Sequence, residues 1–229
     1  PLPLVLVVLQ TEPRPANNAA STLDGNTTDK NTVGWNHVIH GHLDDLNSVW
    51  SALPSSNEAL VSFCHGDDRL APQAPLLLSR AAEASPKAEL FSSDETLQWS
   101  ADPTQPPGNR QNRVSALPWR LLTRGCIGGL VTIRLNRLHQ LELPKQRLCL
   151  HNLILDLSLQ VSAQRHTCEH LSQALLSRKI TTNPAVPEVA SPKGRRVFSA
   201  SQCQEALSIC RERGAHFLTT GGVITAHPK

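Results

Sequence analysis

Residues 58–95, "EALVSFCHGDDRLAPQAPLLLSRAAEASPKAELFSSDE", contain three successive patterns of secondary structure. The apolar run at 58–64 indicates a strand, the stretch from Pro72 indicates a helix with proline in its first turn, and 87–95 indicates another strand. Strand, helix and strand in this order are typical of an α/β fold. In open α/β sheets, ligands bind beyond the carboxyl ends of the strands. We therefore expect two acidic pairs, Asp67 with Asp68 and Asp94 with Glu95, to lie at such ends.

The same α/β pattern extends to both sides of this stretch. A continuous, Val-rich apolar run is typical of a strand covered on both faces of a parallel sheet, and a 3.6-residue apolar period is typical of a helix. Strands are predicted at 4–9, 32–41, 126–134 and 215–227 (a terminal pair), helices at 42–53, 148–161 and 199–214 with Gly214 as the stop, and loops at 10–32 and 102–113. At 148–161 the apolar residues fit either the two-residue period of a strand or the 3.6-residue period of a helix, and the length of the segment favours a helix.

Composition and charge narrow the class of protein. The net charge of +3 comes from 22 basic and 19 acidic residues without a basic stripe, which excludes a nucleic-acid footprint. The apolar start is too short to span a bilayer. Six cysteines without a CxxC pair fit a reducing compartment, and the absence of Met and Tyr is compatible with a piece of a longer product. We predict a main domain at 1–180, a Pro-containing linker at 181–194 and a small helix-strand extension at 195–229.

Four blocks then occur in an order that resembles a known family. They are "ALVSFCHGDDRLAPQAPLLLSRAAEASPKAELFSSDETL" (59–97), "IGGLVTIR" (127–134), "EHLSQALLSRK" (169–179) and "QEALSICRERGA" (204–215). Together they resemble glycosyltransferase family 2 domains of bacterial surface-polysaccharide synthesis, of the O-antigen or rhamnan type. The resemblance implies a GT-A fold, with a Rossmann-type, mostly parallel sheet flanked by helices.

The resemblance also implies chemistry and partners. It implies a nucleotide-sugar donor, Mn²⁺ or Mg²⁺ at the diphosphate, a glycan or lipid-linked acceptor, and a cytoplasmic location at the inner face of a membrane, with peripheral association. A divalent cation offsets the negative charge of the leaving nucleoside diphosphate, and a carboxylate takes the proton of the attacking hydroxyl.

Donor-side positions carry over one by one. The family's D-x-D pattern places its first acid on His65 and its last on Asp67, with Asp68 next, so Asp67 is the expected metal or diphosphate ligand. The alternative is an acidic helix cap before Pro72. Thr11 and Glu12 match the nucleoside contact after the first strand.

The acceptor side departs further from the family pattern. Asp94 and Glu95 match the acceptor-side acids, with a solvated turn as the alternative, and Gly128 and Gly129 indicate a bulge or a close approach of another group. The usual base position is Asn152, and an amide cannot take up a proton at neutral pH. Asp156, one helical turn further, is the nearest carboxylate and the candidate substitute. The family's histidine before Arg178 falls on Ser177.

These departures leave two interpretations open. The first is an active, inverting glycosyltransferase. The second is a catalytically inactive binding or scaffold module with the same fold, beside a further glycosyltransferase domain outside this chain. A separate trio, His166, Cys168 and His170, would share one face of a strand, where zinc binding competes with ordinary packing. Cys203 and Cys210 are expected on the apolar face of a helix.

Overall fold

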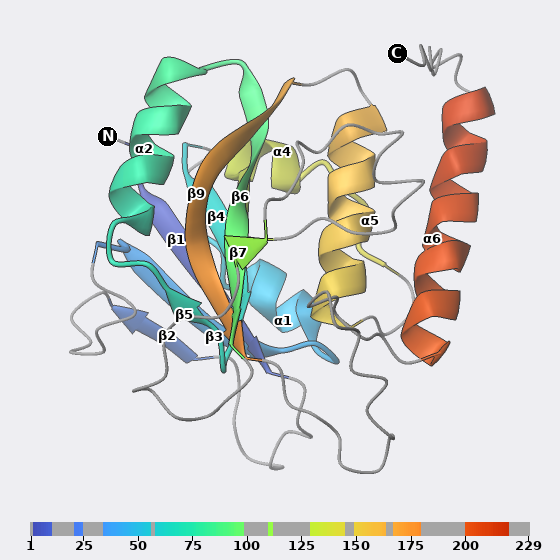
Figure 1. Ribbon diagram of the computed structural model, residues 1–229, viewed down its shortest axis with the longest axis horizontal. Helices are drawn as coiled ribbons and strands as arrows, with labels where there is room; N and C mark the ends of the chain where they lie inside the picture. The colour runs from blue at the N-terminus through green and yellow to red at the C-terminus, as the bar shows by residue number, and fades with distance from the viewer. Residues whose placement is uncertain are drawn as a thin grey trace.

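A mixed sheet of nine strands, with helices on both faces, forms the described part of the chain (Figure 1). The computed structural model describes residues 2–10, 21–24, 34–55, 58–98, 110–111, 129–144, 149–163, 167–179 and 200–219. The strands are β1 (Leu4–Gln10), β2 (Ser21–Asp24), β3 (His37–His42), β4 (Leu60–His65), β5 (Arg69–Leu70), β6 (Ala88–Gln98), β7 (Arg110–Gln111), β8 (Val131–Arg134) and β9 (Thr167–Lys179). The helices are α1 (Leu46–Ser51), α2 (Ala74–Ala84), α4 (Leu135–Leu138), α5 (Leu150–Ala163) and α6 (Ala200–Thr219).

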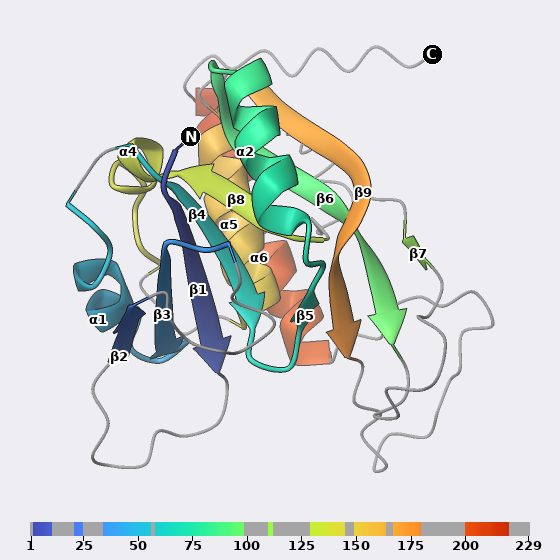
Figure 2. The same ribbon diagram turned by 90° about the vertical axis from the view of Figure 1, so that its left-hand side faces the viewer.

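Five strands of the sheet run in one direction. β1 pairs in parallel with β3 and β4, and β6 pairs in parallel with β9. β8 lies between β4 and β6 and is antiparallel to both, so β4 and β6 have the same direction. The carboxyl ends of all five strands therefore meet at one edge, the lower edge in Figure 2. Ligand sites of α/β sheets lie at this kind of edge.

The α/β class is confirmed, and the sheet is mixed. Three of the described strand pairings are parallel and five are antiparallel. The antiparallel pairs come from β8 and from the short strands β2, β5 and β7. β2 lies inside the stretch predicted as loop at 10–32, and its four residues are too few to give a recognisable alternation.

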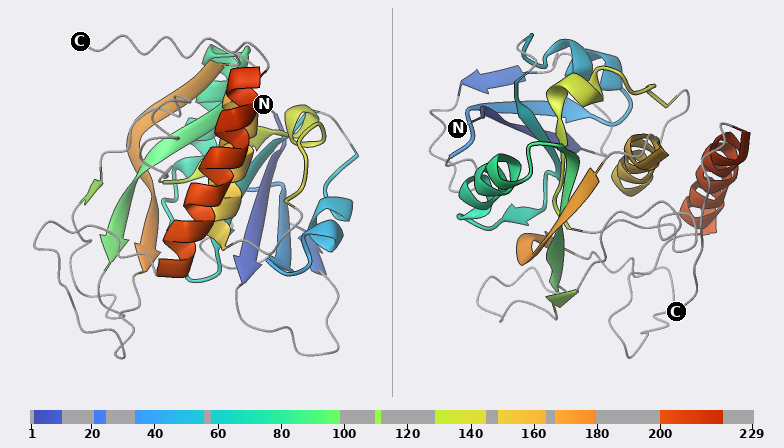
Figure 3. Two further views of the ribbon diagram at one scale, coloured as in Figure 1. Left: turned by 90° about the vertical axis from the view of Figure 1, so that its right-hand side faces the viewer. Right: turned by 90° about the horizontal axis from the view of Figure 1, so that it is seen from above.

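Alternate residues of β1 explain the two-sided core. Val5, Val7 and Leu9 pack with the apolar residues of α1 and α5, whereas Leu4 and Leu6 pack with those of α2 on the other face. Successive side chains of a strand point to opposite faces, so a strand buried on both sides is apolar throughout. Figure 3, seen from above, places α5 against the sheet and α6 outside α5.

The bounds of several helices differ from the predictions. α1 covers the middle of the predicted 42–53, α2 begins at Ala74 with Pro75 in its first turn instead of at Pro72, and α4 falls where no helix is predicted. α5 confirms the choice of helix over strand. α6 continues through Gly214 to Thr219, so the predicted stop is wrong, and residues 215–219 are helical rather than part of a strand. A glycine inside a helix costs only about 1 kcal/mol, which the neighbouring turns can offset.

None of the described helices is long and apolar enough to cross a membrane. Residues 181–194 lie outside the described residues, so the linker and the domain boundaries stay a prediction. α6 packs on α5 through Ile209, which joins the core cluster of the main domain.

Candidate functional site

The turn after β4 separates the two adjacent acids. The side chain of Asp68 is 2% exposed and that of Asp67 is 63% exposed. The backbone N–H of His65 donates to Asp68 Oδ2 at 2.9 Å, and the backbone N–H of Asp68 donates to the His65 carbonyl at 3.0 Å. Asp68 therefore closes the turn, and Asp67 extends from it into solvent at the carboxyl edge of the sheet.

Asp68 belongs to a buried ion-pair network with residues of β6 and β9. Arg178 of β9 places Nε 3.4 Å from Asp68 Oδ1 and Nη1 3.7 Å from a carboxylate oxygen of Glu95 in β6. The same Glu95 oxygen accepts the backbone N–H of Gly129 at 3.1 Å. Buried charges are tolerated when they are paired in this way. The network ties the β4 turn to β6, to β9 and to Gly129 in the segment before β8.

Gly129 lies in close contact with the backbone of β6. Its φ of +75° is a left-handed conformation, and a Cβ at this position would lie 1.8 Å from the carbonyl oxygen of Ser93. Its neighbour Leu130 donates its N–H to Ser93 Oγ at 3.0 Å. The predicted close approach is confirmed for Gly129, while Gly128 lies outside the described residues. Only glycine fits both the φ and the space.

Asp94 and Glu95 lie inside β6, so the expectation that they mark a strand end is wrong. β6 continues to Gln98 because β9 pairs along its length and β7 pairs with Glu95 and Thr96. Asp94 is 2% exposed and Glu95 is fully buried. Neither fits the alternative of a solvated turn. In the described structure both acids bind neighbouring elements instead of facing solvent.

Asp94 belongs to a polar bridge between β6 and β9. His170 Nε2 lies 3.1 Å from Asp94 Oδ1, and His170 Nδ1 lies 3.0 Å from Ser92 Oγ. The order Ser, His, Asp matches a hydrolytic triad by residue type. Ser92 is fully buried within the strand, however, so its hydroxyl is out of reach of a substrate. The bridge satisfies buried polar groups next to an irregularity in the β6–β9 register.

The expected zinc trio is only partly described. His170 is engaged with Asp94 and Ser92, Cys168 lies with Sγ 3.7 Å from Ser162 Oγ, and His166 lies outside the described residues. Burial raises the pKa of the Cys168 thiol, which disfavours the thiolate that zinc requires. No group of three or more His, Cys, Asp or Glu that could hold a metal occurs in the described ranges.

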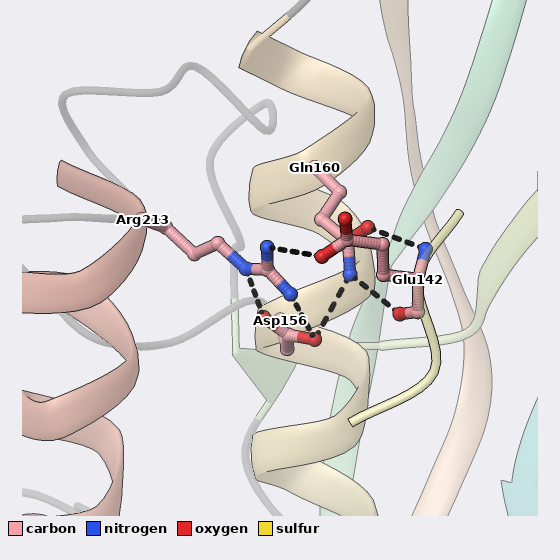
Figure 4. A network of polar contacts seen from close by, with 4 residues as sticks. All are labelled: Glu142, Asp156, Gln160 and Arg213. Carbon is pink, nitrogen blue, oxygen red and sulfur yellow. Dashed lines mark hydrogen bonds and ion pairs between the residues drawn. The ribbon is translucent and has the colours of Figure 1, made fainter. Parts of the chain in front are cut away.

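The expected base positions lie in the interface between α5 and α6. Asn152 is 1% exposed, and its amide donates to the Glu205 carboxylate of α6. Asp156 accepts from Arg213 with both oxygens, from Nε at 2.7 Å and from Nη2 at 3.2 Å, and also from Gln160 at 3.0 Å (Figure 4). Burial lowers the pKa of the Arg213 guanidinium, but the hydrogen bonds and charges of Asp156 and Glu142 outweigh it, so that this pKa is raised.

A divalent cation could bind at the turn that carries Asp67 only if the substrate supplied further ligands. Asp67 offers one exposed carboxylate, and His65 Nδ1 lies 3.8 Å from its Oδ2. Mg²⁺ in proteins is often held by one or two carboxylates together with substrate phosphates and water. Asp67 meets that requirement, while His65 Nδ1 accepts the backbone N–H of Asp67 at 3.3 Å. The expected nucleoside contacts, Thr11 and Glu12, lie outside the described residues.

Sequence reasoning missed the partners that engage the expected residues. Arg178 and Asp68 are 110 positions apart in the chain, and Arg213 and Asp156 are 57 apart. No local spacing signals such pairs. In comparisons with known proteins, no family model matches the chain and no curated protein matches it.

Proposed function

We propose that this chain is a glycosyltransferase-like domain that binds a nucleotide-sugar at the carboxyl edge of the sheet and transfers the sugar to a glycan or lipid-linked acceptor. The proposal places it in cell-surface glycan synthesis on the cytoplasmic side of a membrane, with the GT-A arrangement as its fold. The observation that carries it is the exposed Asp67 just beyond β4, on a turn that the buried Asp68–Arg178 pair holds in place.

The diphosphate of a donor and the Asp67 carboxylate are both negative, so they need a cation between them. Mn²⁺ or Mg²⁺ would supply that charge and would stabilise the leaving diphosphate as a Lewis acid. Asp67 would hold the ion, and His65 would lie beside it. Because Asp68 is already committed to Arg178 and to the His65 backbone, Asp67 is the acid of this turn that faces a ligand.

A second candidate is a catalytically inactive binding or scaffold module of the same fold. The observation that favours it is the pairing of Asp156, the candidate proton acceptor, with Arg213. Both carboxylate oxygens of Asp156 accept hydrogen bonds from the guanidinium, so neither is open to the hydroxyl of an acceptor. The two candidates share the donor site and differ in whether transfer occurs.

Calorimetric titration tests the donor site. UDP, dTDP and GDP would be titrated with and without MnCl₂ into the wild type, Asp67→Ala and Glu83→Ala, the last being an exposed acid on α2 that serves as the matched control. We expect metal-dependent binding of one nucleotide, weakened about tenfold or more in Asp67→Ala and unchanged in Glu83→Ala. Equal binding by Asp67→Ala, or no nucleotide binding by the wild type, would refute the proposal.

The same proteins separate the two candidates. Release of nucleoside diphosphate from the corresponding nucleotide-sugar, with water or a glycan acceptor, indicates transfer. Metal-dependent binding without release indicates the inactive module.

A further inference from the structure

Between residues 204 and 213, where the structure describes the side chains of α6, polar and apolar side chains both join this helix to the rest of the domain. Among the α6 side chains that the structure describes, Ile209 is buried, Ala206 and Cys210 are partly buried against the core, and Leu207 is 57% exposed. A helix docked mainly by apolar burial carries a broader apolar stripe. Over residues 204–213, polar contacts therefore add to a narrow apolar stripe.

Those polar contacts join two helices that run in the same direction. Asn152 meets Glu205, and Asp156, one turn further along α5, meets Arg213, about two turns further along α6. Arg213 also lies 3.4 Å from Glu142, and Gln160 connects Asp156 to the backbone of Glu142 (Figure 4). The Asp156 side chain is 5% exposed and that of Arg213 is 18% exposed, so water screens their pairing only weakly.

We propose that α6 is a releasable cover over α5, that the Asp156–Arg213 pair holds it in place, and that docking withholds Asp156 from proton transfer. The last part rests on the proposed function. While α6 is docked, both oxygens of Asp156 accept hydrogen bonds from Arg213. When α6 leaves, water replaces the guanidinium and the carboxylate becomes free to accept a proton.

The pair makes docking sensitive to loss of one partner. Without Arg213, the docked state would keep a nearly buried carboxylate without its cation, which is costly, whereas the undocked state would solvate it. Replacing both partners by apolar side chains removes the buried charge and is often neutral or stabilising. Loss of one partner and loss of both therefore have opposite expected effects on docking.

Amide hydrogen exchange measured by mass spectrometry tests the cover. We compare Arg213→Met with Arg211→Met, an exposed arginine on the same helix, and with the double variant Asp156→Leu/Arg213→Met. In Arg213→Met, exchange over 200–219 should accelerate about tenfold or more, with β1 still protected. Arg211→Met should match the wild type, and the double variant should restore most of the protection.

Two results would overturn the cover. One is unchanged exchange over 200–219 in Arg213→Met, and the other is a double variant that loses as much protection as the single one. If β1 also loses protection in Arg213→Met, the whole fold has been lost. The same exchange measurement on Arg213→Lys then tests the cover. Lysine keeps the charge but cannot form the two parallel bonds. Faster exchange over 200–219 with β1 protected then supports the cover, and unchanged exchange refutes it.

The functional part is tested by release of nucleoside diphosphate from UDP-, dTDP- and GDP-sugars in water. In that reaction the water oxygen bonds to the anomeric carbon, one water proton passes to Asp156, and the bond from carbon to the diphosphate oxygen breaks. The nucleoside diphosphate leaves with that electron pair. Arg213→Met should release it about tenfold faster than the wild type, and adding Asp156→Asn should abolish the gain.

The two parts of the proposal and the proposed function fail in different ways. If the wild type binds no nucleotide by calorimetry, the proposed function fails, and the cover is judged by exchange alone. If nucleotide binds and α6 undocks but release does not rise, the withholding of Asp156 is refuted while the donor site stands.

Discussion

Arg178→Met removes the cation that two buried carboxylates share, and we expect it to be among the most destabilising single changes in the sheet. The Arg178 side chain is 6% exposed, and those of its partners Asp68 and Glu95 are 2% and 0% exposed. Methionine fills part of the space but offers no charge. The variant therefore leaves two carboxylates in the protein interior, one of which closes the turn that carries Asp67.

The size of the effect follows from the burial. Removing one partner of a buried ion pair typically costs about 3–5 kcal/mol because the other partner stays buried and uncompensated. For a domain of this size, each kcal/mol lowers the melting temperature by roughly 2–4 °C, which gives a fall of roughly 6–20 °C. An exposed surface ion pair would cost under about 1 kcal/mol.

Thermal and urea unfolding followed by circular dichroism would measure the change. Arg69→Met is the matched control, since Arg69 is exposed on β5 and its neighbour along the pairing is Ser177, next to Arg178. We expect Arg69→Met to change the free energy of unfolding by less than about 0.5 kcal/mol. A loss in Arg178→Met no larger than in the control would refute the reasoning that this network stabilises the β4 turn.

Two further predictions concern the same part of the sheet. Gly129→Ala should lower the free energy of unfolding by roughly 3 kcal/mol, because a side chain there combines a left-handed φ with a Cβ 1.8 Å from the Ser93 carbonyl oxygen. Gly66→Ala, whose nearest contact would be an ordinary 3.5 Å, is the control in urea unfolding, and equal losses would contradict the argument. Burial, with a smaller contribution from the negative charge of Asp68, raises the pKa of the Cys64 thiol, so the thiol stays protonated at about pH 8. Iodoacetamide should therefore leave Cys64 unmodified in the folded protein and modify it in denaturant, and rapid native labelling of this site would show that the strand opens.

The sequence predicts the elements whose apolar residues have a strong period. It does not predict the strand bounds that depend on pairing with distant strands. β1, β4, α2 and α5 follow from apolar runs and helical spacing, which local sequence carries. β6 runs past Asp94 and Glu95 because β7 and β9 pair with it, and that pairing depends on residues up to 81 positions away. The polar residues at 92–96 look like a strand end until their partners are known.

The candidate site shows the same limit at the level of single side chains. Asp67 and Asp68 are adjacent and chemically equivalent, so no local rule decides which is buried. Arg178 decides it, since it takes Asp68 into the interior and leaves Asp67 outside. Similarly, Asp156 is the nearest carboxylate to Asn152 in sequence, and its pairing with Arg213 becomes visible only when α6 is placed on α5.

The lengths of the outermost strands bear on how this domain behaves at high concentration. In the described residues the sheet ends in β2, with four residues, on one side and in β5, with two, on the other. The unpaired N–H and C=O groups of an edge strand are the template on which another chain can add a strand and begin to aggregate. Strands this short offer few such groups, and the longest strands, β6 and β9, pair with each other. Because β5 covers β9 only at Leu176 and Ser177, the short outermost strands limit edge-to-edge aggregation at β2 and β5 but leave the rest of the outer edge of β9 without a described partner strand.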